Sequence, residues 1–70
     1  MQGITLDIKK RLESYTNLEY LTFNDCGLES LENFPDLPNL IRLELIGNKL
    51  TEVSSLGHLS KLQSLWLGGN

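Results

Sequence analysis

Residues 40–50 read LIRLELIGNKL, and the same arrangement of apolar residues recurs at a fixed distance on both sides. Residues 18–28 read LEYLTFNDCGL and residues 62–70 read LQSLWLGGN, so each copy begins 22 residues after the previous one. A constant period in the twenties indicates stacked supersecondary units, none of which buries its apolar side alone. The period predicts a repeat architecture over residues 18–70, with two complete copies and an incomplete third.

The centre of each copy predicts a short β-strand, because alternate side chains of a strand point to opposite faces. In the middle copy, Leu43 and Leu45 are expected to point inward, while Arg42 and Glu44 face solvent. The equivalent positions of the other copies predict a parallel three-stranded sheet. Its outward side chains form three columns: Tyr20, Arg42 and Ser64; Thr22, Glu44 and Trp66; and Asn24, Ile46 and Gly68.

The second half of each repeat has to return the chain to the start of the next parallel strand. We call residues 28–37 the first return segment and residues 50–59 the second. Pro35 and Pro38 exclude a regular helix around the first, and Gly57 weakens one in the second. We therefore expect the returns to be 3₁₀ turns or extended chain.

The N-terminal part predicts a helix instead of a strand. Thr5 or Asp7 is suited to cap a helix that runs to about Tyr15. Its apolar residues match the first return segment when the sequence is shifted back by 22 residues. We interpret residues 4–16 as a helical cap over the open end of the core, which divides the chain into a cap (1–17) and repeats (18–70).

The repeat pattern resembles the leucine-rich repeat of the short 22-residue class. This resemblance implies an α/β solenoid: a horseshoe fragment with an N-terminal helical cap and a parallel sheet on its concave side. Residues 18–28, 33–38 and 43–45 also resemble the N-terminal part of the acidic leucine-rich nuclear phosphoproteins, a likeness that covers residues 4–50. That family implies binding of histones or phosphatases with the help of a long acidic tail, which the 70 residues do not contain.

Composition and motifs argue against several classes of function. The net charge is −3, and the Lys9–Arg11 cluster is too short for the basic stripe of a nucleic-acid-binding domain. His58 has no partner at ligand spacing, and Cys26 occupies a structural position of the repeat. We expect no enzyme activity, no cofactor and no metal.

The sequence also favours an intracellular protein, either cytoplasmic or nuclear. It opens without the basic start and apolar run of a signal peptide. No apolar stretch approaches the about 18 residues of a membrane span. We expect neither a membrane nor a nucleic acid among its partners.

Function is expected in protein–protein contact. The last strand would be an edge with unpaired backbone groups, so we expect either that the chain is the start of a longer protein or that this edge pairs with another chain. Our first hypothesis is a homodimer in which Leu65–Trp66–Leu67 pairs antiparallel with its own copy, and a larger or head-to-tail assembly stays open. The alternative is an adaptor whose concave face binds a nuclear or cytoplasmic protein of the phosphatase or histone class.

The candidate binding residues follow from these two hypotheses. Trp, Tyr and Arg anchor protein interfaces more often than other residues. Trp66 could instead pack on Arg42 and Glu44 or on a symmetry partner. The expected protein-binding residues are Tyr20, Thr22, Arg42, Glu44, Ile46, Ser64, Leu65, Trp66 and Leu67.

Overall fold

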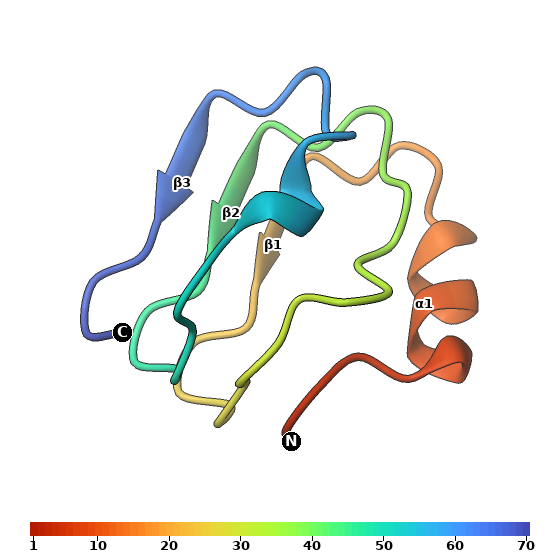
Figure 1. The fold of residues 1–70 in the computed structure, drawn as a ribbon. Coiled ribbons are helices and arrows are strands. Elements are labelled where there is room, and N and C mark those ends of the chain that lie inside the picture. The colour runs from red at the N-terminus through yellow and green to blue at the C-terminus, as the bar shows by residue number, and fades with distance from the viewer.

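A computed structural model describes residues 1–70 as a parallel sheet with one α-helix and one 3₁₀ turn (Figure 1). The sheet consists of three strands in the order β1-β2-β3, namely β1 (Tyr20–Thr22), β2 (Arg42–Glu44) and β3 (Ser64–Trp66). Helix α1 spans Leu6–Glu13, and the 3₁₀ turn η1 spans Ser54–Leu56. Three parallel strands with one helix agree with the leucine-rich-repeat-like fold that the sequence predicts.

The strands pair with a register of one sequence period. Leu21 lies opposite Leu43, and Leu43 lies opposite Leu65, so each pair is separated by 22 residues. Hydrogen bonds continue past the short strands, since the N–H of Leu45 donates to the carbonyl of Trp66 at 2.8 Å. The parallel sheet predicted from the sequence is therefore confirmed in its order and its register.

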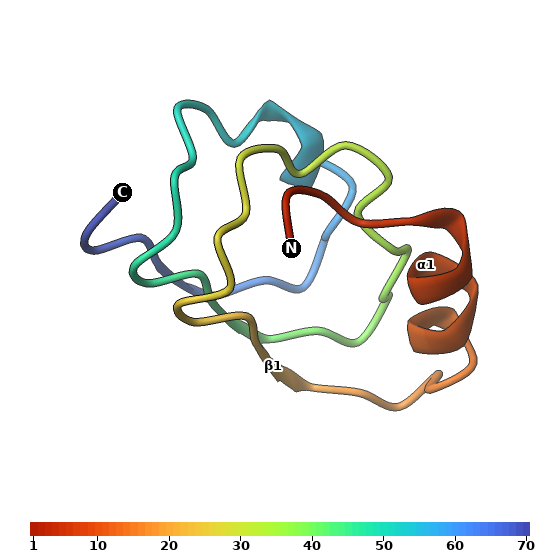
Figure 2. The same ribbon diagram turned by 90° about the horizontal axis from the view of Figure 1, so that it is seen from below.

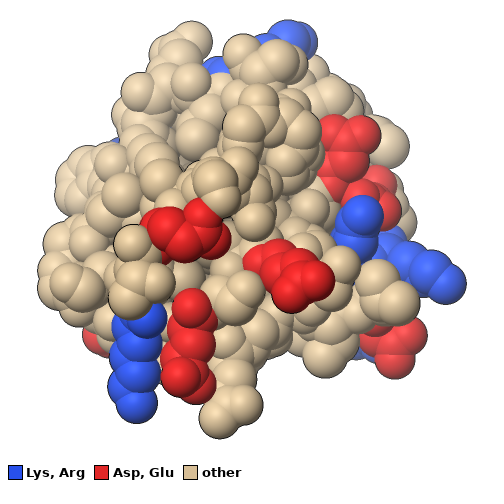
Figure 3. All heavy atoms as spheres, in the orientation of Figure 1, with Lys and Arg blue, Asp and Glu red and all other residues tan.

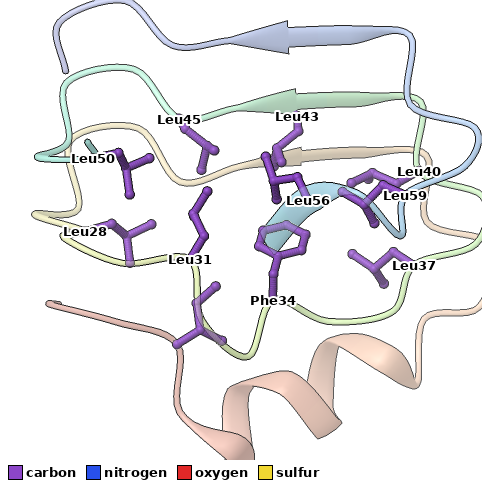
Figure 4. Packing of buried hydrophobic residues seen from close by; sticks show 11 residues of the cluster. Leu28, Leu31, Phe34, Leu37, Leu40, Leu43, Leu45, Leu50, Leu56 and Leu59 are labelled. Atoms are coloured by element: carbon purple, nitrogen blue, oxygen red, sulfur yellow. The ribbon is translucent and has the colours of Figure 1, made fainter. Parts of the chain in front are cut away.

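The core lies between the sheet and the return segments (Figure 4). Leu43 and Leu45 of the middle repeat are fully buried, as are Leu28 and Leu31 of the first return segment. The second return segment contains η1, whereas the first contains no regular helix. The buried apolar residues are Ile4, Leu28, Leu31, Phe34, Leu37, Leu40, Leu43, Leu45, Leu50, Leu56 and Leu59.

A buried amide joins the first two repeats at the turn after the strands. The Oδ1 atom of Asn48 accepts hydrogen bonds from the N–H groups of Cys26 (3.0 Å) and Leu28 (3.1 Å). Its Nδ2 atom donates to the carbonyls of Phe23 (2.8 Å) and Leu45 (2.9 Å). Asn48 thereby satisfies backbone groups of its own repeat and of the preceding one, which burial would otherwise leave unpaired.

Asn70 makes the equivalent contacts one repeat later. Its Oδ1 accepts from the N–H of Leu50 at 3.0 Å, and its Nδ2 donates to the carbonyls of Leu45 and Leu67, both at 2.8 Å. Cys26, which holds this position in the first repeat, has no amide to offer. The asparagine contacts repeat with the period of the sequence.

The same turn requires a left-handed backbone at one position of every repeat. Asp25, Gly47 and Gly69 have φ of 55°, 73° and 72°. A Cβ at Gly47 would collide with the Asp25 side chain, so this glycine is needed for space as well as for conformation. Neighbouring turns therefore stack closely.

Helix α1 begins as expected and ends earlier than expected. The Thr5 Oγ1 accepts from the N–H of Ile8 at 3.2 Å, which identifies Thr5 and not Asp7 as the N-cap. The helix ends at Glu13, before the expected Tyr15. Ser14 is the C-cap residue, and its hydroxyl donates to the carbonyl of Arg11 at 2.6 Å.

The helix lies beside the first return segment at one end of the stack (Figure 2). The Glu13 carboxylate accepts from the N–H of Asp36 at 2.7 Å, and the carbonyl of Thr16 accepts from Nδ2 of Asn39 at 2.8 Å. Ile4 is buried in the core, while Ile8 packs against it from the helix. The boundary at residue 17 between a cap and the repeats stays a prediction.

Candidate protein-interaction surface on the sheet

The strand side chains that point away from the core form a surface that we call the open sheet face. It consists of Tyr20, Thr22, Arg42, Glu44, Ser64 and Trp66. Tyr20 is 67% exposed and Trp66 is 45% exposed, which is unusual for large aromatic residues. The alternation of the strands explains this, because the inward positions between them hold Leu21, Leu43 and Leu65.

Arg42 is held between two neighbours at the centre of this face. Its Nε and Nη2 atoms each lie 3.0 Å from Oε2 of Glu44, which forms a double contact within one strand. Its Cζ atom lies 4.3 Å from the centre of the Trp66 ring on the adjacent strand. The guanidinium group therefore combines an ion pair with a cation–π contact.

Asn24 extends this network to the end of the first strand. Its Nδ2 donates to Oε1 of Glu44 at 3.0 Å, while its Oδ1 accepts from the N–H of Ile46 at 2.8 Å. Both carboxylate oxygens of Glu44 are thus engaged. The chain of contacts from Asn24 through Glu44 and Arg42 to Trp66 crosses all three repeats.

The structure brings together only part of the predicted set of binding residues. Arg42, Glu44 and Trp66 form one cluster, and the sequence had left their mutual packing open as an alternative. Leu65 of β3 and Leu67, which follows it, lie on the core side of the sheet, and Leu65 is 36% exposed. Thr22 and Tyr20 are exposed, whereas Ser64 and Ile46 are half-buried.

Asn24 was not among the predicted site residues. The sequence placed Asn24 in the same outward column as Ile46 and Gly68. An amide at this position reaches the backbone of the next repeat, as the bond to the N–H of Ile46 shows. The pattern of leucines did not reveal this contact, because it reports burial and not hydrogen bonding.

The histidine and the cysteine, the side chains best suited to bind a metal or act as a nucleophile, both make contacts within the fold. His58 Nε2 lies 3.0 Å from the carbonyl oxygen of Pro35, and its ring tilts against Phe34. The half-buried Cys26 thiol donates to the carbonyl of Asn24 at 3.4 Å. No group of three or more His, Cys, Asp or Glu residues is placed to hold a metal ion.

The exposed carboxylate of Glu52 lies in the second return segment, away from the open sheet face. The hydroxyl and the N–H of Ser54 donate to this carboxylate, and these hydrogen bonds lower the pKa of Glu52. Other acidic side chains gather over the face formed by the return segments (Figure 3).

Comparisons with known proteins show what the chain is similar to. It is 46% identical to a histone of Tetrahymena thermophila over 90% of the chain, and 46% identical to acidic leucine-rich nuclear phosphoprotein 32 family member A of Drosophila melanogaster over 83%. Over the full length of the present chain, it is 36% identical to an acidic leucine-rich nuclear phosphoprotein 32-related protein of Plasmodium falciparum.

Its homologues are acidic leucine-rich nuclear phosphoprotein 32 family members and other leucine-rich repeat proteins. This confirms the resemblance drawn from the repeat pattern. The chain spans 17–26% of the length of these three relatives. No family model matches the chain, and no solved structure matches it significantly. None of its helices has the length and apolar character needed to cross a membrane.

The stacking of Arg42 on Trp66 can be measured as a coupling energy. We expect a double-mutant cycle of Arg42→Met and Trp66→Leu to give a coupling of about 0.5–1 kcal/mol in the free energy of urea unfolding. The control cycle pairs Trp66→Leu with Lys9→Met on α1 and should give about zero. Equal coupling in the two cycles would contradict the contact.

Proposed function

We propose that the chain is a non-enzymatic protein-interaction module that binds a partner protein through the open sheet face. The observation that carries this proposal is the cluster of Trp66, Arg42 and the exposed Tyr20 on one surface. These three residue types dominate the binding energy of protein interfaces. The leucine-rich repeat homologues support a protein-interaction role in general.

The cluster is suited to binding because its side chains are ordered in advance. Glu44 and Trp66 fix the position of Arg42, and Asn24 fixes Glu44. A side chain that is already ordered loses less conformational entropy when a partner arrives. Since Glu44 balances the charge of Arg42, we expect recognition by aromatic contact and hydrogen bonds and less by net charge.

The class of partner and the location are part of the same proposal. The relatives are named as nuclear phosphoproteins and as a histone, which supports a nuclear location. The partner in this proposal is a nuclear or cytoplasmic protein of the histone or phosphatase class, as the family resemblance implies. In this proposal the sheet forms the concave side of a leucine-rich repeat horseshoe. The ligand would lie across the strands and contact several repeats.

Capture from a nuclear extract tests the binding surface. We expect the double variant Tyr20→Ala/Trp66→Ala to capture less than about one tenth of the protein that the unmodified chain captures, because it removes two aromatic anchors. The control variant Glu29→Gln/Glu32→Gln alters the return-segment face and should retain them. Unchanged capture by the aromatic double variant, with its fold verified by circular dichroism, would refute the proposed surface.

A second proposal is self-association through the edge of β3. Leu65 is 36% exposed, although Leu43 at the same position of the preceding repeat is fully buried. Residues 62–70 contain no charged side chain that would oppose contact with another chain. The apolar edge of β3 is therefore suited to pair with another strand.

Sedimentation equilibrium of the 70-residue chain tests this second proposal. We expect the average mass to exceed that of the monomer at micromolar concentrations, and the variant Leu65→Glu to sediment as a monomer. The control Ser30→Glu adds the same charge to an exposed site of the first return segment and should associate like the unmodified chain. A folded monomer at all these concentrations would exclude self-association.

A further inference from the structure

An open apolar pocket lies between α1 and the outer side of β1. Its volume is about 390 Å³, within the usual range of binding pockets. Its lining comes from α1, from the inward side chains of the first repeat and from the N-terminal residue, namely Met1, Asp7, Ile8, Arg11, Leu12, Leu21 and Phe23. No residue of β2 or β3 contributes, so the pocket lies on the side of β1 that faces away from the sheet.

The position of α1 explains why this pocket exists. Through Glu13 and Thr16, the helix and the turn after it contact Asp36 and Asn39, which lie 23 residues later. Helix α1 therefore occupies the place of a return segment, one repeat before the first. In a regular repeat, a strand would precede this return and pair with the outer side of β1. The sheet has no such strand, because β1 is its edge.

Strand β3 has the complementary arrangement. Leu65 of β3 and Leu67, directly after it, occupy the positions of Leu43 and Leu45 one repeat later. Leu43 and Leu45 are fully buried, whereas Leu65 is 36% exposed and Leu67 is half-buried. In a parallel ladder, alternate residues direct both backbone groups to the same side. Because Ser64 and Trp66 pair with β2, the backbone groups of Leu65 and Leu67 point to the outer edge.

We propose that β3 of a second copy of this chain docks parallel to β1, with its Leu65 and Leu67 in the pocket. This rests on the self-association proposed above and names the surface that receives β3. Leu65 of the second copy would lie beside Leu21, as Leu43 does on the other side. Strand β3 of one copy and α1 of the next together complete one repeat, with the same 22-residue register as within the chain.

Charge and symmetry both bear on this joint. The pocket carries one acidic and one basic residue, Asp7 and Arg11, and the docking segment 62–70 is uncharged, so no like charges are brought together. The contact joins two different surfaces and is therefore heterologous. Antiparallel pairing of β3 with its own copy, the geometry expected from the sequence, would leave the pocket unused.

Mixing two blocked variants distinguishes these geometries. Leu12→Glu places a charge in the pocket and leaves β3 intact, while Leu65→Glu blocks β3 and leaves the pocket intact. We expect each variant alone to sediment as a monomer and their mixture to form a one-to-one complex, because one intact end of each kind remains. Ser30→Glu carries the same added charge but keeps both surfaces. It should therefore associate with either variant, which shows that the charge alone does not prevent association.

The outcomes distinguish docking of β3 in the pocket from self-association of the chain in general. If Leu12→Glu alone still dimerises, and adding Leu65→Glu forms no mixed complex, β3 pairs with itself and the pocket proposal is wrong. If the unmodified chain is a monomer, the proposal of self-association is itself wrong.

Thr22→Pro is a second variant that blocks the surface around the pocket. It removes an N–H at the outer edge of β1 that the chain's own sheet does not use. It should behave like Leu12→Glu.

Discussion

The side-chain amide of Asn48 is the contact on which the rest of the structure depends. With four hydrogen bonds, it ties the backbone of the second repeat to that of the first. Its environment is buried, so any shift of one repeat along the other would leave several polar groups unpaired at a cost of about 1–3 kcal/mol each. The amide thus fixes the 22-residue register, and Asn70 repeats the arrangement one step later.

The register determines what the open sheet face presents. A slip of one residue would turn every strand side chain to the opposite face. In the observed register, Glu44 lies beside Trp66 and Arg42 lies beside Ser64, which brings the guanidinium of Arg42 over the indole. A contact made in the turn therefore positions, several residues away, the cluster that we propose as a binding surface.

The sequence predicts the strands, their register and the direction of their side chains, because these follow from two periods, 2 and 22 residues. It predicts the helix and its cap residue less closely, since Thr5 and Asp7 are both suitable caps. The end of α1 at Glu13 could not be predicted from periodicity, because the apolar spacing of Ile8 and Leu12 continues to Tyr15. The pairing of Asn24 with Glu44 and the pocket beside β1 depend on rotamers and on the placement of α1, which require tertiary structure.

Urea unfolding of the variant Asn48→Ala tests the role of this amide most directly. The account predicts a loss of about 3 kcal/mol in the free energy of unfolding, because buried N–H and carbonyl groups of two repeats lose their partner. Asn39→Ala is the matched comparison. Asn39 also bridges repeats, through Thr16 and Lys61, but in more exposed surroundings, and its loss should cost about 1 kcal/mol or less. Equal losses for the two variants would contradict the account.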